Sequence, residues 1–285
     1  RIAAETSRLS DEKARLTALL TEIPVAMTLV NADDCIVLYD GQAAEVLSQQ
    51  AVPRLMAPLS DYFDASAVKS ARARMDRTGK EVTATLPGAD GRQNYEARLK
   101  PMQGGGYMLT IDAAQSTMPP EAARPIVYDF DLLNRQTAAC AENTPLRDLI
   151  FTVFDTETTG LLPHKDEIVQ IGAVRMVNGR IVDGEVIDQL VDPGCPIPPA
   201  STKVHHVTDA MVRGQPDIAE AGRRFHQFAQ DSVIVAHNAP FDMAFLHRHK
   251  GRMGVAWDHP ILDTVLLSAV LFGASQTHTL DALCE

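Results

Sequence analysis

The first residues of the chain place apolar side chains at a seven-residue period, with charged residues between them. The apolar positions are Ile2, Leu9, Leu16 and Ile23. This period gives one apolar row along a helix, but Thr6 and Lys13 interrupt the second row that a coiled coil needs. Residues 1–23 are therefore predicted to form a helix. It is either one strand of a coiled coil that joins a homodimer or an amphipathic helix packed on the next domain.

Between residues 24 and 113 the pattern changes to short apolar runs separated by turn-forming residues. The runs VAMTLV and CIVLY are divided by NADD, and EVTATL and YEARLKPM are divided by PGADGR. Asp40 precedes the short helical stretch QAAEVL and is suited to cap it. GGGYMLTID ends in another strand. The predicted order is a hairpin, short helices and then three strands.

This order of elements resembles that of PAS sensor domains, and the leading helix resembles the signalling helix that often precedes them. The resemblance implies an α+β domain over residues 24–113 that dimerises or binds a small ligand. All nine histidines lie at or beyond His164, so this domain has no histidine to ligate haem. Cys35 lacks the asparagine-cysteine-arginine signature of flavin-binding light sensors. The identity of the ligand is left open.

A linker and connector are predicted over residues 114–148. Residues 114–125 are polar and proline-rich, which is typical of linkers. Residues 126–148 are expected to pack against the domain that follows them.

The clearest pattern begins at residue 149, where LIFTVFDTETTG joins an apolar strand to two acidic residues. Asp155 and Glu157 are two residues apart, so both project from the same face of a strand. Like charges this close are unfavourable unless a cation lies between them. A strand end that carries two solvated acids would have the same local sequence.

A third acidic residue follows 87 residues after Asp155, at a predicted strand–helix junction. DSVIVAHNAPFD runs from a buried strand into a helix, with Pro240 suited to the first helical position. Asp242 lies in the first turn, where the helix dipole favours an anion, so it could serve as a capping charge alone. Between the two motifs, Asn178 and Gly179 predict a hairpin turn.

FDTETTG at 154–160 and HNAPFD at 237–242 resemble the first two motifs of the DEDD 3′–5′ exonucleases. The match is to the histidine-bearing branch, which includes the proofreading subunit of bacterial replicative polymerase. The resemblance covers residues 149–285 and implies an α/β fold of the ribonuclease-H type, with a mixed sheet flanked by helices. It also implies metal-dependent removal of nucleotides from 3′ ends, with single-stranded DNA favoured over RNA.

The resemblance also implies roles for individual residues. Three carboxylates would be catalytic ligands of two divalent cations, Mg²⁺ or Mn²⁺: Asp155, Glu157 and Asp242. Three further residues would lie near the terminal nucleotide: Thr158, His205 and Phe241. Two such ions activate a water and stabilise the leaving oxygen, and hard oxygen ligands suit Mg²⁺. His206 departs from the family pattern, because relatives commonly have glycine there.

The family's third motif, a histidine followed five residues later by aspartate, has no counterpart in the chain. Leu283 stands five residues after His278, and Asp281 stands only three after it. The general base and the fourth carboxylate are therefore expected beyond Glu285. The last residues are interpreted as the start of a helix that buries Leu280 and Leu283. The chain as given is expected to bind metal weakly and to show little or no nuclease activity.

The net charge of the chain neither supports nor excludes a nucleic-acid substrate. The net charge is −11, of which −4 falls in residues 1–150 and −7 in residues 151–285. Neither half carries the basic surplus that grips phosphates by charge alone, although bound cations would supply it. The four cysteines are far apart and lack metal-ligand spacing, which favours reduced thiols in the cytoplasm. Because the chain begins at Arg1, an upstream membrane anchor is left open.

The remaining histidines are assigned no catalytic role. His237 is interpreted as a residue that shapes the turn of the second motif. Four others are expected on the surface: His226, His247, His249 and His259. The alternative to an active exonuclease is a signalling or nucleic-acid-binding protein whose exonuclease fold has lost catalysis.

Overall fold

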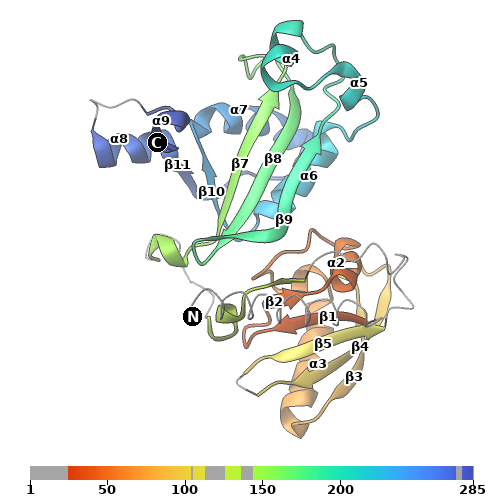
Figure 1. Ribbon diagram of the computed structural model, residues 1–285. Coiled ribbons are helices and arrows are strands. Elements are labelled where there is room, and N and C mark those ends of the chain that lie inside the picture. The colour runs from red at the N-terminus through yellow and green to blue at the C-terminus, as the bar shows by residue number, and fades with distance from the viewer. Residues whose placement is uncertain (1–24, 104, 113–125, 136–143, 274–277, 285) are drawn as a thin grey trace, which may run out of the picture. The chain divides into compact units, whose positions relative to one another are not determined.

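The computed structural model describes residues 25–103, 105–112, 126–135, 144–273 and 278–284 (Figure 1). The chain divides into two compact units, Arg1–Thr137 and Ala138–Glu285. The helix and coiled coil predicted for residues 1–23, and the linker predicted for 114–125, lie outside the described residues. Among the helices within them, none combines the length and the apolar composition needed to cross a membrane.

The first unit is built on a six-stranded antiparallel sheet with strand order β3-β4-β5-β1-β2-β6. Its strands are β1 (Val25–Val30), β2 (Ile36–Tyr39), β3 (Val82–Pro87), β4 (Asn94–Pro101), β5 (Tyr107–Asp112) and β6 (Val127–Tyr128). Buried and exposed residues alternate along β4, as expected for a sheet with one covered face.

Short helices lie between β2 and β3 in sequence, as predicted. They are α2 (Gly41–Ser48), the 3₁₀ turn η1 (Leu59–Asp61) and α3 (Ala65–Thr78). The predicted cap at Asp40 is confirmed, because its Oδ1 accepts a hydrogen bond from the Ala43 amide at 2.7 Å. Its Oδ2 accepts another from the Met27 amide at 3.1 Å, which ties α2 to β1. Burial raises the pKa of this carboxyl to about 6.

Residues 126–135, the described first part of the segment after the linker, belong to the first unit, whereas the whole segment was predicted to pack on the following domain. β6 pairs antiparallel with β2, and η4 (Phe130–Asn134) continues from it. The Asn31 side-chain amide donates to the carbonyl of Leu132 at 3.2 Å. The cause is the open edge of β2, whose backbone groups gain partners when a strand is added. The first described element of the second unit is η6 (Leu146–Asp148).

The second unit contains the predicted mixed sheet, with strand order β11-β10-β7-β8-β9. Its strands are β7 (Phe151–Thr158), β8 (Ile168–Val177), β9 (Arg180–Leu190), β10 (Val233–Ala236) and β11 (Ile261–Asp263). β10 is parallel to β7 and β11, whereas β8 is antiparallel to β7 and β9. The predicted hairpin joins β8 to β9, with Asn178 and Gly179 both at positive φ.

Helices accompany this sheet, and α6 and α7 pack on each other and against its strands (Figure 1). The helices are α4 (Pro199–His205), α5 (Asp209–Val212), α6 (Ile218–Ala229), α7 (Ala239–Met253), α8 (Thr264–Phe272) and α9 (Leu280–Cys284). Phe225 of α6 packs on Phe154 of β7 with ring centroids 4.9 Å apart, so α6 covers the strand that carries the acidic pair. The α/β architecture predicted for this half is confirmed.

The predicted burial of the C-terminal helix is wrong. Leu280 is 55% exposed, and no described residue of α9 is buried. The preceding α8 offers little core to pack against, because its only buried residue is Ser268. Instead, Ser268 Oγ of α8 makes a polar contact of 2.7 Å with Nδ1 of His278, which lies two residues before α9.

Candidate active site

The acidic pair lies on β7, in the middle of the sheet of the second unit. Phe154, Thr156 and Thr158 are buried on one face of this strand, while Asp155 is exposed and Glu157 half-buried on the other. The two carboxylates therefore share a face, as the two-residue spacing predicts.

Asp242 reaches β7 from the first turn of α7. Asn238 precedes this helix in a left-handed conformation (φ 65°), and Pro240 is its second residue. The Asp242 carboxylate is buried, and its Oδ1 accepts two hydrogen bonds from Thr156. The Thr156 amide donates at 3.1 Å and its hydroxyl at 2.6 Å. Thr156, the residue between the two acids, thus connects the two sequence motifs.

The electrostatics of the three carboxylates are unfavourable in the absence of a cation. Burial raises the pKa of Asp242 to about 6, with Thr156 opposing and the charge of Asp155 adding to the rise. Although part of the Asp155 side chain reaches solvent, partial burial of its carboxyl also raises its pKa. The pKa of Glu157 is raised by burial and then by the charge of Asp155. The charge of Asp155 therefore raises the pKa of both Glu157 and Asp242, and a cation bound near Asp155 would relieve this repulsion.

Two histidines influence this region. A positive charge on His237 would lower the pKa of Asp155, and one on His205 would lower that of Glu157. His237 is oriented by a contact of 2.9 Å between its Nδ1 and Thr264 Oγ1, which suits the turn-shaping role predicted for it. His205 Nδ1 accepts from the Val207 amide at 3.1 Å, so the proton of a neutral ring lies on Nε2. That Nε2 is buried and has no hydrogen-bond partner within the described residues.

The other residues assigned to the nucleotide lie close to these motifs in sequence. Thr158 is buried, and its hydroxyl donates to the carbonyl of Gly160 at 2.7 Å. Phe241 is half-buried beside Asp242 and meets the Phe245 ring edge-on at a centroid distance of 5.2 Å. His206, where relatives commonly have glycine, has a φ of 64° at the end of α4. It therefore adopts the left-handed conformation that glycine favours there.

The chemistry of the donor set suits a hard divalent cation, because all three proposed ligands are carboxylates. In the part of the chain that the structure describes, however, no three histidine, cysteine, aspartate or glutamate side chains are grouped closely enough to hold an ion. The three carboxylates therefore have the chemistry and charge that a divalent cation needs. Their side chains are not close enough together to bind one ion as a complete set of ligands.

One histidine expected on the surface is buried. His249 is 4% exposed, and its Nε2 lies 2.8 Å from Glu167 Oε2. Burial lowers the pKa of His249. The helical spacing contained the signal, because His249 lies seven residues after the buried Asp242 and hence on the same face of α7. Sequence reasoning missed it by treating each histidine separately.

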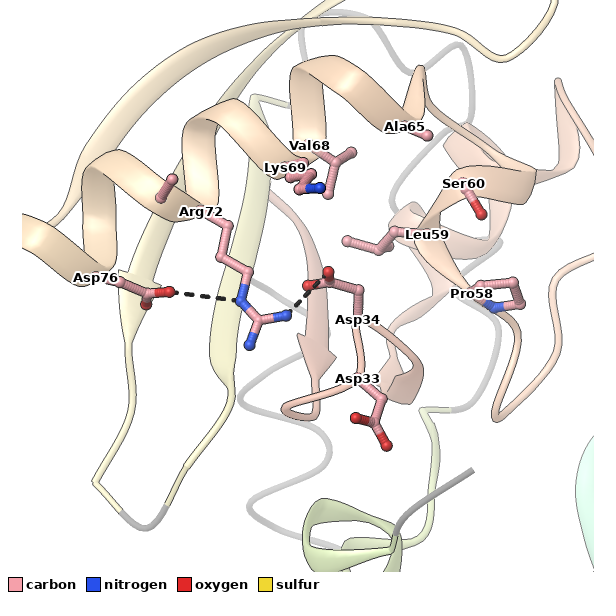
Figure 2. Close-up of a pocket in the computed structure, with 11 residues that line it drawn as sticks. Asp33, Asp34, Pro58, Leu59, Ser60, Ala65, Val68, Lys69, Arg72 and Asp76 are labelled. Carbon is pink, nitrogen blue, oxygen red and sulfur yellow. Dashed lines mark ion pairs between the residues drawn. The ribbon is translucent and has the colours of Figure 1, made fainter. Parts of the chain in front are cut away.

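A cavity of about 490 Å³ is a second candidate site, in the first unit (Figure 2). It lies between α3, η1 and the turn from β1 to β2, and Leu59 and Val68 form an apolar wall. Arg72 reaches across it between Asp34, at 2.9 Å, and Asp76, at 3.6 Å. These three side chains are part-exposed, so the cavity has an apolar wall and a charged rim.

The family match lies within the second unit. Residues 152–285 match the RNase_T family, described as exonuclease. A DNA polymerase III subunit epsilon-like protein of Rhodobacter capsulatus is 63% identical over 161 residues, which cover 56% of this chain and 23% of that protein. A PolC-type DNA polymerase III of Halalkalibacterium halodurans is 38% identical over 142 residues, which cover 50% of this chain and 10% of that protein.

Among solved structures, Exonuclease X in complex with 5′ overhanging duplex DNA matches with 29% identity and a TM-score of 0.39. The match covers 47% of this chain and 70% of that one. The chain spans less than a quarter of the length of either curated relative. Residues 152–285 are thus similar to the exonuclease family, and the chain is similar to parts of epsilon-like and PolC-type DNA polymerase III proteins.

Proposed function

We propose that residues 149–285 form a metal-dependent 3′–5′ exonuclease of the DEDD type, with single-stranded DNA as its substrate. The observation that supports this most is the link at Thr156, which joins Asp242 of one motif to the strand of the other. Asp155, Glu157 and Asp242 would hold the cations. Bound Mg²⁺ or Mn²⁺ would supply the positive charge that activates a water and stabilises the leaving oxygen.

The terminal nucleotide would lie against Thr158, His205 and Phe241. The unpartnered Nε2 of His205 supports this assignment, because a buried donor without a partner gains from an incoming acceptor. The half-buried ring of Phe241 offers an apolar face on which a base can stack. DNA is preferred to RNA because the similar proteins are named as DNA polymerase III proteins.

The test is to incubate the full-length protein with 3′-labelled single-stranded DNA, with single-stranded RNA as a second substrate. We expect mononucleotide release that requires Mg²⁺ and is lost in Asp155→Asn. The matched control is Asp183→Asn, which changes an exposed aspartate of β9 and should leave release unchanged. Residues 1–285 alone are expected to show little or no release in the same assay. Absence of metal-dependent release from both substrates would refute an active exonuclease.

The second candidate is a nucleic-acid-binding or signalling protein that has lost catalysis. It is favoured by the incomplete ligand set among the described residues. Calorimetric titration with Mg²⁺ and Mn²⁺ separates the two candidates. If the wild type binds two ions tightly and Asp155→Ala does not, the hypothesis of lost catalysis is contradicted. If the wild type shows no such binding, that hypothesis is supported.

We also propose that the first unit is PAS-like and regulates the second by binding a small ligand. The hairpin, short helices and three strands that follow one another in sequence support this assignment. The cavity beside α3 is the proposed ligand site, since its volume falls within the ordinary range for small-molecule sites. An apolar wall and a charged rim favour a compact ligand that has both an aliphatic body and a charged group.

Thermal unfolding of the protein with a panel of amino acids and short dicarboxylates tests this site. The control variant is Ala73→Trp, which places a large ring in the cavity from an exposed position of α3. We expect at least one compound to raise the melting temperature of the wild type and not of the variant. No stabilisation, or equal stabilisation of both, would contradict the proposed site. Light scattering tests the homodimer proposed to form through the N-terminal helix and this unit.

A further inference from the structure

The loop that joins β7 to β8 begins directly after the acidic pair and is closed by hydrogen bonds at both ends. The Thr159 amide donates to the Glu167 carbonyl at 2.8 Å, and the Glu167 amide donates to Thr159 Oγ1 at 2.9 Å. Asp166 Oδ2 accepts from the Leu162 amide at 2.9 Å. Ser201 of α4 donates its hydroxyl to the Thr159 carbonyl at 2.7 Å. The loop therefore has one defined conformation beside the site.

Arg248 of α7 connects this loop to the helix that carries Asp242. Its Nη1 donates to the carbonyls of Pro163, at 2.9 Å, and Asp166, at 2.7 Å. Its Nη2 donates to Glu167 Oε1 at 2.5 Å, while His249 lies 2.8 Å from the other oxygen of that carboxylate. One guanidinium thus satisfies three acceptors from two parts of the loop, an arrangement that the fork of donors in arginine permits.

We propose that Arg248 is a positioning residue: it fixes residues 161–166 to α7 so that the loop forms a rigid wall beside the acidic pair. The inference rests on the proposed exonuclease function. Two connections support it: α7 contacts β7 through Asp242 and Thr156, and it contacts the loop that follows β7 through Arg248. The wall presents exposed side chains, among them Leu161 (79% exposed) and Lys165, that are free to contact a bound strand.

If Arg248 served only global stability, its loss would lower the stability of the whole unit rather than free the loop alone. Arg248 and Glu167 are 31% and 18% exposed, so their pairing is partly solvated and contributes little to global stability. Its loss should release the loop while the core of the unit stays folded. Lysine should not restore the wall, because a single ammonium cannot reproduce the planar fork that reaches all three acceptors.

The test compares the wild-type chain with Arg248→Ala and Arg248→Lys. The matched control is Arg252→Ala, which removes an arginine of the same helix whose partner is the exposed Asp217, at 3.1 Å. Hydrogen exchange of the loop amides is measured first, on residues 159–167. We expect exchange about tenfold faster or more in both Arg248 variants and unchanged in the control, with a urea midpoint close to wild type. Unchanged exchange in Arg248→Ala would overturn the proposal.

The second measurement concerns the substrate. With a 3′-labelled single-stranded oligonucleotide we expect KM to rise about tenfold in both Arg248 variants, with kcat changed much less. Should the full-length wild type prove inactive, the proposed exonuclease function fails. Wherever no turnover is measurable, the dissociation constant of the same oligonucleotide, from fluorescence anisotropy, replaces KM. An Arg248→Ala protein with wild-type KM or affinity would refute the positioning role even if the loop exchanges faster.

Discussion

Asp242→Asn is expected to stabilise the second unit in the absence of divalent cations, although it removes a proposed catalytic carboxylate. Both hydrogen bonds from Thr156 end on Oδ1, so the asparagine side-chain oxygen can accept them unchanged. What the substitution removes is the charge. Asp242 has a pKa of about 6 in the folded protein, against an ordinary value of 3.8. Burial of the ionised form therefore lowers the free energy of unfolding.

The magnitude follows from proton linkage. Because the folded state holds its proton more tightly than the unfolded state, stability falls as the pH rises from 3.8 to about 6. A shift of roughly two units corresponds to about 3 kcal/mol, and Asp242 is only 2% exposed, so solvent screening does not reduce it. The asparagine variant buries no ionised carboxylate at this position and so does not lose this free energy of unfolding. The difference between the two proteins should be near zero below pH 4 and reach its full value above pH 6.

Urea unfolding of both proteins in EDTA, from pH 4 to pH 8, measures this difference. Asp183→Asn serves as the control, because it removes a carboxylate from an exposed position. At pH 7 we expect Mg²⁺ to reduce the difference in unfolding free energy between the variant and the wild type, since an ion that binds the folded wild type stabilises it. The reasoning would be wrong if Asp242→Asn destabilised the protein at pH 7, or if the difference did not vary with pH.

Two further predictions concern stability. Glu185→Gln should lower the free energy of unfolding of the second unit by about 3–5 kcal/mol in urea, because it leaves the guanidinium of Arg175 without a carboxylate that lies 3.0 Å away in a fully buried pair. An unchanged urea midpoint would contradict this. Gly106→Ala should destabilise the first unit by more than Gly91→Ala in thermal unfolding. Both glycines have positive φ, which costs alanine about 1–2 kcal/mol, but only at Gly106 would the added Cβ overlap the carbonyl oxygen of Val30. Equal losses in the two variants would contradict it.

Local patterns in the sequence predicted most of the elements. The strands at residues 25–30 and 36–39, the cap at Asp40 and the hairpin at Asn178 and Gly179 were all predictable, because period, turn residues and caps act over a few neighbours. The shared face of Asp155 and Glu157 was predictable for the same reason, since it depends only on the geometry of one strand.

The predictions failed where a partner distant in sequence decides the outcome. Residues 127–128 were expected to join the following domain, yet they pair with β2, an edge that the segment itself does not reveal. His249 was expected on the surface, yet it lies buried against Glu167, which is 82 residues earlier in the chain. Leu280 was expected to be buried, yet it is 55% exposed, because the described helix α8 that precedes it has no buried apolar residue that it could pack against.

The sequence by itself determined that this protein carries an acidic pair on a strand, a third acid at a helix start, and motifs resembling an exonuclease. Only the tertiary structure decided that Thr156 holds Asp242 against that strand, and that Arg248 connects the same helix to the loop after it. The physical reason is the range of the interactions. Strand and helix periods are properties of adjacent residues, whereas these hydrogen bonds join residues more than eighty positions apart and exist only when the sheet and α7 pack together.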